Sequence, residues 1–327
     1  MTPDLLEILA CPDCRGALSL TVSSHDEGRI DSGTLRCASC ARTFPIVRHI
    51  PRFVPADTYA SSFGFQWNTF RTTQLDSHTG LPISRERLIK ESRWTLADLA
   101  GRRVLDVGCG AGRFAEVALS AGASLVAMDY SSAVDACFAN LGRHPRLCVL
   151  QADVRHLPLK PESFDYVYCL GVLQHTADPH QTVLALAPPL KHGGRLVLDC
   201  YPRLVANLLW PKYWLRPVTR RMPQERLFAM VQWLVPKLLP IGRALAAIPR
   251  LGRRLRYLLP IMTYYGVFPL TREQHREWAT LDTFDMLAPA HDHPQTAASV
   301  RAWLTEAGLR DVEAAREGLV VGRAVKG

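Results

Sequence analysis

A short apolar run that ends in three closely spaced glycines constrains this chain more than any other feature. Residues 104–107 predict a buried strand, and Gly108, Gly110 and Gly112 predict the tight turn that leaves it. Apolar residues at helical spacing follow in 113–119. A strand, a glycine turn and a helix form the first half of a nucleotide-binding βαβ unit, so the chain is predicted to fold as an α/β protein.

An acid beside the turn indicates which ligand it binds. The glycines are spaced G-x-G-x-G, whereas a dinucleotide site has G-x-G-x-x-G. Asp106 lies two residues before the first glycine, where its charge would repel a pyrophosphate at the helix N-terminus. A carboxylate here suits a ligand with cationic groups, such as the ammonium and sulfonium of S-adenosylmethionine. Residues 106–112 resemble motif I of the class I S-adenosylmethionine-dependent methyltransferases, which implies a Rossmann-like, seven-stranded α/β fold.

Segments downstream agree with that resemblance. Strands are predicted at 124–129, 147–153 and 163–171. Residues 190–198 are predicted to contain the end of a helix, two glycines that terminate it, and a fifth strand. In this family the acid ending the second strand binds the ribose hydroxyls and the acid ending the third faces the adenine amino group. The implied cofactor-binding residues are Asp106, Gly108, Cys109, Gly110, Gly112, Asp129, Tyr130, Asp153, Val154 and Leu170.

Two C-x-x-C pairs near the N-terminus predict a metal site. Cys11 and Cys14 are separated from Cys37 and Cys40 by twenty-two residues. Four thiolates complete the tetrahedral shell of structural zinc and leave no open position for catalysis. Residues 5–53 resemble the small zinc-ribbon family whose eukaryotic members activate RNA and protein methyltransferases. We expect the metal to supply the folding free energy of this ribbon, whose core should be separate from that of the enzyme.

The chain is predicted to have three parts. These are a zinc-ribbon domain (1–55), a linker with N-terminal lid helices (56–100), and a methyltransferase domain (101–327) with a helical basic insertion at 203–272. Within them we expect one helix over 85–99, a short helix over 273–280, a helix over 297–307 capped by Thr296, and final strands at 309–315 and 318–325.

Composition bears on the compartment. No signal-peptide pattern opens the sequence, and no uncharged apolar run is long enough to span a membrane. The nine cysteines are an odd number, and those outside the two pairs are scattered, as in reduced cytosolic proteins. We therefore expect a cytoplasmic protein, which could also lie peripherally at the inner membrane.

The positive charge of the chain is concentrated in one segment. The net charge is +9, but residues 203–256 contain twelve lysines and arginines and one acid, Glu225, and so carry +11. Tryptophans and leucines are mixed among these cations, and prolines are expected to break the segment into short helices. Three partners fit: an anionic membrane or a lipid-linked substrate presented there, RNA, or solvent alone around a basic lid.

The methyl acceptor is the least constrained element of the site. His175, just after the fourth predicted strand, is the leading candidate for a general base, although it could equally fix the turn there. The other candidates for the general base are Asp178, Asp285 and His291. Residues 282–289 resemble a block that borders the acceptor pocket in small-molecule methyltransferases. His291, Asp292 and His293 are poor chelators without a further ligand, so a loop role is favoured.

Two classes of function remain open. The core resembles the methyltransferase type 11 and ubiquinone-pathway methylases, which implies O- or C-methylation of a small-molecule, glycan or lipid-linked acceptor. The alternative is an RNA methyltransferase that binds rRNA or tRNA through the zinc ribbon and the basic insertion. Against RNA, the fourth strand is followed by Leu-Gly-Val-Leu (170–173) rather than an Asn-Pro-Pro-Tyr-like motif.

Overall fold

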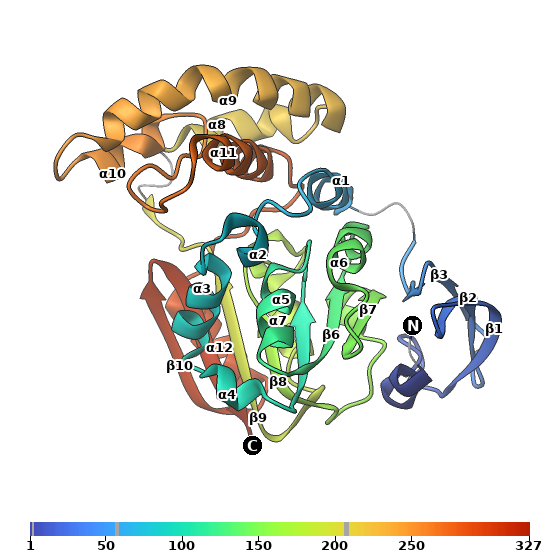
Figure 1. Ribbon diagram of the computed structural model, residues 1–327. Coiled ribbons are helices and arrows are strands. Elements are labelled where there is room, and N and C mark those ends of the chain that lie inside the picture. Colours follow the sequence, from blue (N-terminus) through green and yellow to red (C-terminus); the bar gives the residue numbers. More distant parts are fainter. Residues whose placement is uncertain (2, 56–58, 206–208) are drawn as a thin grey trace.

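The computed structural model describes residues 1, 3–55, 59–205 and 209–327 of the chain. Residues 56–58, at the start of the predicted linker, and residues 206–208 of the predicted insertion lie outside the described residues. Figure 1 shows a central sheet, a small N-terminal sheet beside it, and a group of helices beyond one end of the central strands.

The central sheet confirms the predicted α/β fold. Its seven strands lie in the order β10-β11-β9-β8-β5-β6-β7. The five strands from β9 to β7 are parallel, and β11 is antiparallel to both of its neighbours. The chain adds β6 and β7 on one side of β5 and then crosses to β8 on the other. The carboxyl ends of β5 and β8 therefore form the switch point at which open α/β sheets bind ligands.

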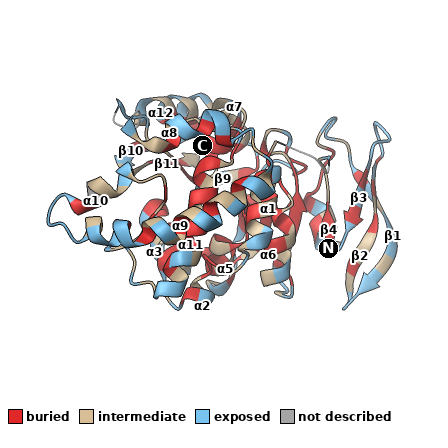
Figure 2. Ribbon diagram, turned by 90° about the horizontal axis from the view of Figure 1, so that it is seen from above, coloured by how far each residue is buried: buried red, intermediate tan, exposed pale blue. Residues whose placement is uncertain are grey.

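The strand bounds agree closely with the sequence predictions. The amino-terminal five are β5 (Arg103–Val107), β6 (Ser124–Asp129), β7 (Leu147–Gln151), β8 (Phe164–Cys169) and β9 (Leu190–Cys200). The last two are β10 (Leu309–Glu317) and β11 (Leu319–Lys326). Helices cover both faces of the sheet (Figure 2): α7 (Pro179–Ala185) and α12 (Ala297–Glu306) lie on one side, and α5 (Arg113–Ser120) and α6 (Ala133–Leu141) on the other. Because both faces are covered, the central strands are almost continuously apolar.

The N-terminal part is a four-stranded antiparallel sheet in sequence order. It consists of η1 (Pro3–Ile8), β1 (Leu18–Asp26), β2 (Arg29–Cys37), β3 (Thr43–Val47) and β4 (Ile50–Pro51). The expectation of two separate cores is wrong. Leu9 and Leu35 belong to the same buried cluster as Leu150 and Leu157. The N-terminal sheet is too small to bury its apolar side chains alone, so it packs them against β7 and the loop that follows.

Two of the predicted helices need correction. The single helix expected over 85–99 is two helices, α3 (Ile83–Ser92) and α4 (Leu96–Leu99). Arg93 between them has a left-handed φ of 59°, and Thr95 then caps α4 with a capping box. The helix end expected at 190–192 is also wrong, because α7 stops at Ala185 and 190 already lies in β9. The adjacent prolines 188 and 189 end helical structure there.

The insertion is more regular than its prolines suggest. It contains α8 (Pro211–Thr219), α9 (Gln224–Ala246), α10 (Gly252–Leu255) and η5 (Arg256–Leu258). The predicted break into short helices is wrong for α9, which continues through Pro236 and Pro240 over 23 residues. Its buried side chains recur every four residues, at Leu227, Val231, Val235 and Leu239. Packing of this stripe in the cluster shared with α11 (Arg272–Leu287) outweighs the hydrogen bonds that each proline removes.

The C-terminal region returns the chain to the sheet. The short helix expected over 273–280 is the first half of α11, which Thr271 caps and which runs on to Leu287. The predicted cap of the next helix is confirmed, since the Thr296 side chain accepts a hydrogen bond from the Ser299 amide at 3.0 Å. None of the described helices combines the length and the hydropathy needed to span a bilayer.

Candidate functional site

The glycine turn after β5 needs glycine for two reasons. Gly108, Gly110 and Gly112 have φ values of 79°, 52° and 95°, in the left-handed region that side chains disfavour. A Cβ at Gly108 would overlap Val172, and one at Gly110 would lie 3.1 Å from the Trp67 ring. The turn is therefore packed tightly between the chain after β8 and a helix from the N-terminal lid.

Asp106 is buried at the carboxyl end of β5. The residue is 2% exposed, and its Oδ2 has no hydrogen-bond partner among the described residues. Burial is the main cause that raises the pKa of this carboxyl to about 8, and the neighbouring hydroxyl of Tyr168 acts in the opposite direction. An unpaired buried carboxyl is costly, so a cation beside it would stabilise the ionised form. This orphaned oxygen fits the cationic ligand that the sequence predicts.

Asp129 lies next to the same turn, at the end of β6. Its Oδ1 accepts hydrogen bonds from the amide of Ser131 at 2.8 Å and from its hydroxyl at 2.7 Å. Its Oδ2 accepts from the Gly110 amide at 3.1 Å. Burial raises the pKa of Asp129, and these hydrogen bonds act in the opposite direction. The carboxylate is thus held in a fixed orientation against the glycine turn.

Asp153 is not the last residue of its strand. β7 ends at Gln151, and Asp153 instead begins the short helix η2 (Val154–His156). Its Oδ2 lies 2.7 Å from Nη2 of Arg155 in an ion pair. Of the other residues predicted to bind the cofactor, Cys109, Val154 and Leu170 are buried and Tyr130 is half-buried. The adenine-binding role of Asp153 and Val154 stays a prediction.

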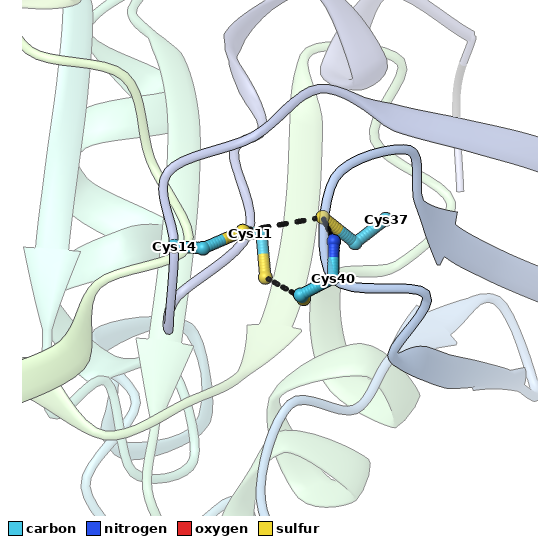
Figure 3. A group of neighbouring side chains, drawn as sticks. All are labelled: Cys11, Cys14, Cys37 and Cys40. Atoms are coloured by element: carbon cyan, nitrogen blue, oxygen red, sulfur yellow. Dashed lines mark hydrogen bonds between the residues drawn. The ribbon is translucent and has the colours of Figure 1, made fainter.

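The four cysteines of the N-terminal sheet converge on one point. Their Sγ atoms all lie within 4.8 Å of one another. Figure 3 shows Cys11 and Cys14 facing Cys37 and Cys40 from two neighbouring loops, with Sγ–Sγ distances of 3.7 Å between Cys11 and Cys40 and 3.4 Å between Cys14 and Cys37. No disulfide joins them. Four convergent thiols are a suitable donor set for tetrahedral zinc.

Two family models match parts of the chain. Residues 105–198 match the family described as "Methyltransferase domain", and residues 2–48 match the family described as "Trm112p-like protein". The chain contains a class I S-adenosylmethionine-dependent methyltransferase domain. In front of it lies a Trm112p-like region with the four-cysteine cluster.

Individual relatives resemble parts of the chain. A tRNA U34 carboxymethyltransferase of Pseudomonas aeruginosa is 42% identical over 106 residues, which are 31% of this chain and 33% of that protein. A ubiquinone biosynthesis O-methyltransferase of Xylella fastidiosa is 30% identical over 167 residues, 50% of this chain and 66% of that protein. The crystal structure of magnesium protoporphyrin IX methyltransferase from Synechocystis aligns with a TM-score of 0.44 and 18% identity, covering 82% of this chain and 97% of that one. The matches to the carboxymethyltransferases span about a third of those relatives' length.

The methyltransferase domain is covered by a lid that the sequence prediction left out of the site. Helix α1 (Ser61–Thr69) places Trp67 on the glycine turn and Phe63 against His175, with ring centroids 5.1 Å apart. Tyr59 packs on Tyr130 at 4.9 Å. The dense aromatics of 63–67 were a usable signal, but packing of a connecting helix explains such a pattern equally well from sequence alone.

His175 is enclosed at the end of β8, within η3 (Leu173–His175). It is 7% exposed, and burial lowers the pKa of its imidazole, so the ring is neutral at pH 7. Nδ1 lies 3.1 Å from the carbonyl oxygen of His291. A carbonyl can only accept, so Nδ1 carries the proton and Nε2 carries the lone pair.

The other candidates for the general base have different surroundings. Asp178 caps α7 by accepting a hydrogen bond from the Gln181 amide at 3.1 Å, which explains it as a structural residue. His291, Asp292 and His293 form no metal-binding group within the described ranges. Asp292 instead pairs with Lys212 of α8, Oδ2 to Nζ at 2.7 Å. The loop role favoured for this trio is therefore the better interpretation.

Two acids on α11 accept hydrogen bonds from the segment that precedes the methyltransferase domain. Asp285 accepts a hydrogen bond from Gln66 of α1 at 3.2 Å, and Asp282 accepts one from Gln74 at 3.1 Å. Tyr264 also donates to Asp282, whose pKa is raised to about 7, mainly by burial. Close by, a cavity of about 110 Å³ lies between α1, the α8–α9 loop and the end of α11, with Tyr59, Arg220 and Ala288 in its wall.

Proposed function

We propose that this protein transfers a methyl group from S-adenosylmethionine to a small-molecule, glycan or lipid-linked acceptor. The observation that carries the proposal is the buried, unpaired oxygen of Asp106 beside the glycine turn, at the switch point of the sheet. A cationic cofactor supplies the partner that this oxygen lacks. A carboxylate at the same place disfavours a pyrophosphate-containing cofactor.

Each residue of the cofactor site has a separate task in this proposal. The carboxylate of Asp106 binds the positively charged part of the cofactor, and the glycine turn lets the backbone approach the cofactor. Asp129, oriented by Ser131 and Gly110, accepts hydrogen bonds from a pair of hydroxyls. The cofactor supplies an activated methyl group with a neutral leaving group. The protein therefore contributes mainly alignment and the exclusion of water by the α1 lid.

A hydroxyl acceptor also needs its proton removed, and His175 suits that task. Its Nε2 carries a lone pair because Nδ1 is committed to the His291 carbonyl. The ring is held between Phe63 and Tyr201, with centroid distances of 5.1 Å and 5.6 Å. Phe63 of the lid therefore covers one side of the imidazole ring.

RNA methylation is the second candidate, because several of the matching relatives are tRNA U34 carboxymethyltransferases. Those matches cover about a third of each chain, so they support the transfer domain more than the acceptor. The basic insertion would be the RNA-binding surface. Two of its cations, Lys212 and Arg216, are buried against Asp292 and cannot contact phosphates.

The four-cysteine cluster, we further propose, holds one structural zinc ion. Elemental analysis of protein purified without chelators should find one zinc per chain, bound through Cys11, Cys14, Cys37 and Cys40. Protein with no stoichiometric zinc would end this assignment.

Two measurements test the proposed activity. Calorimetry should detect S-adenosylmethionine binding, and Asp129→Ala should weaken it by at least about tenfold because charge-assisted hydrogen bonds are lost. Next, the protein is incubated with methyl-labelled cofactor and, separately, a lipid extract, a pool of polar metabolites and total RNA. Label in lipid or small molecules supports the proposal, and label in RNA alone supports the alternative. No cofactor binding would contradict both.

A further inference from the structure

Helix α8 turns its apolar side outward. Lys212, Arg216 and Thr219 are buried at 2%, 7% and 5% exposure. Trp214 and Val218, on the opposite side of the helix, are each 66% exposed. A helix at the surface of a globular protein normally has the reverse arrangement, with its apolar side toward the core.

Specific polar contacts fix α8 in this orientation. Lys212 pairs with Asp292 at 2.7 Å, and Arg216 donates to the carbonyl oxygens of Met286 and Pro289 at 3.1 Å and 2.8 Å. Thr219 donates to the Leu287 carbonyl at 3.0 Å. These contacts satisfy the carbonyl end of α11, where helical partners are missing. Rotating α8 to hide its apolar side would expose or orphan all of them.

The exposed apolar side chains extend beyond α8. Of the fifteen large hydrophobic residues that are exposed in the described part of the chain, thirteen lie within 204–267. On α9 and the segment after it, Trp233 is 62% exposed, Leu251 55% and Leu258 60%. Figure 1 places α8, α9 and α10 at the end of the molecule away from the central sheet. We call the exposed side chains of 209–258 the outer surface.

Cations surround these apolar side chains. The exposed ones are Arg220, Arg221, Arg226, Lys237, Arg243 and Arg250, and the one acid of the segment is Glu225. Lys237 lies over the Trp233 ring, with Nζ 3.5 Å from its centroid. Aromatic and aliphatic groups mixed with arginine and lysine are the composition of helices that lie in the headgroup region of anionic membranes.

We propose that the outer surface, formed by α8 with its outward-facing Trp214 and Val218 and by the cationic helices beside it, docks on an anionic lipid bilayer. The apolar side chains enter the headgroup boundary, and the cations contact lipid phosphates. The docking is peripheral, since no described helix is built to cross a bilayer. This inference goes beyond the proposed function and does not depend on it.

The positive charge and the exposed apolar side chains of this surface favour a membrane over other partners. A second copy of the chain would bring two strongly positive surfaces together, which costs free energy unless acids intervene. RNA would neutralise the cations and could stack on tryptophan, but it offers no apolar environment for Val218, Leu251 and Leu258. An anionic bilayer satisfies both kinds of side chain at once.

The test is sedimentation of the full-length protein with lipid vesicles. Vesicles of phosphatidylcholine alone are compared with vesicles that also contain phosphatidylglycerol, at low and at high salt. Binding should rise with phosphatidylglycerol content. Salt should weaken it only in part, because screening acts on the cations and not on apolar burial.

Variants separate the two contributions. Trp214→Ser with Val218→Ser should lower partitioning at least about tenfold, and Arg243→Gln should lower it about fivefold. The matched controls are Val22→Ser with Val47→Ser, which remove exposed valines from the N-terminal sheet, and Arg36→Gln on β2. These residues are exposed, so the variants should fold, which unchanged thermal unfolding verifies. The controls should bind vesicles as the unaltered protein does.

Several results would overturn the proposal. One is equal binding to neutral and anionic vesicles, or none to either; another is an equal loss in variants and controls. Size-exclusion chromatography that shows self-association abolished by Trp214→Ser would assign the surface to a second copy. Binding to RNA with a steep salt dependence, and no binding to vesicles, would assign it to nucleic acid.

Discussion

If Asp106 binds the cofactor as we propose, cofactor affinity should depend on pH. The pKa of Asp106 is raised to about 8 in the ligand-free protein, so at neutral pH the carboxyl is largely protonated. A cationic ligand binds the ionised form and must displace that proton. Affinity for S-adenosylmethionine should therefore increase about tenfold between about pH 6 and about pH 7, in a range where the ligand's own ammonium remains charged.

Calorimetry in buffers of different ionisation enthalpy measures this directly, because it counts protons released on binding. Asp106→Asn cannot ionise, so it should bind more weakly and lose the pH dependence. An affinity that is flat over this range in the unaltered protein would contradict the proposed role of Asp106.

His175 is predicted to act through a lone pair, and its replacement tests that. His175→Gln preserves polarity but removes a base, and should reduce kcat by about a hundredfold or more while cofactor affinity changes little. The natural control is Asp178→Asn nearby, which alters a helix cap and should leave kcat almost unchanged. If His175→Gln retains full kcat with an intact pH profile, the histidine has only a packing role between Phe63 and Tyr201.

At the scale of elements, α8 depends on one buried acid. Asp292 faces Lys212 and Arg216, and all three side chains are less than 10% exposed. Asp292→Ala would leave two buried cations without their acid, so urea unfolding should show a loss of about 3–5 kcal/mol. Breaking the exposed pair of Lys191 and Asp165 with Lys191→Ala should cost at most about 1 kcal/mol. Equal effects of the two changes would mean that the Asp292 network does not hold α8.

Sequence patterns predicted elements well where local and tertiary preferences agree. The strand from Ser124 to Asp129 and the capped helix after Thr296 were found almost to the residue, because a continuous apolar run marks the strand and a capping residue marks the start of the helix. The prediction was wrong for α9, where Pro236 and Pro240 oppose helix formation and only packing against α11 reveals why the helix continues. It missed Lys212 and Arg216 as buried residues, since their partner Asp292 lies almost eighty residues away.

In the candidate site, too, the sequence predicted the residues placed by local patterns and missed those placed by tertiary packing. Motif I and the acid at Asp129 come from strand ends, which are local patterns, and these residues do lie together. Trp67 and Phe63 reach the site from the lid by tertiary packing, so their role became visible only in the fold. The sequence placed Asp153 at the end of a strand, whereas it lies at the start of η2, where it pairs with Arg155.

At the scale of the whole molecule, the N-terminal sheet and the methyltransferase domain are joined by polar contacts as well as by a shared core. Arg15 donates to the carbonyl oxygens of Leu157 and Leu159, each at 2.7 Å. Arg52 donates to Gln151 at 2.7 Å and to Asp135 at 2.8 Å. The N-terminal sheet therefore contributes to the stability of β7 and of the loop after it, as well as to its own stability.

Zinc removal should consequently destabilise the methyltransferase domain. All seven tryptophans lie outside residues 1–55, so their fluorescence reports on the rest of the chain. A chelator that extracts the metal should lower the Tm seen by tryptophan fluorescence by at least about 5 °C, because the shared core loses one of its walls. Cys37→Ser should begin at the lower Tm and respond no further to the chelator. If a metal-sensitive dye records zinc release while the tryptophan transition stays in place, the two parts are energetically independent despite their common core.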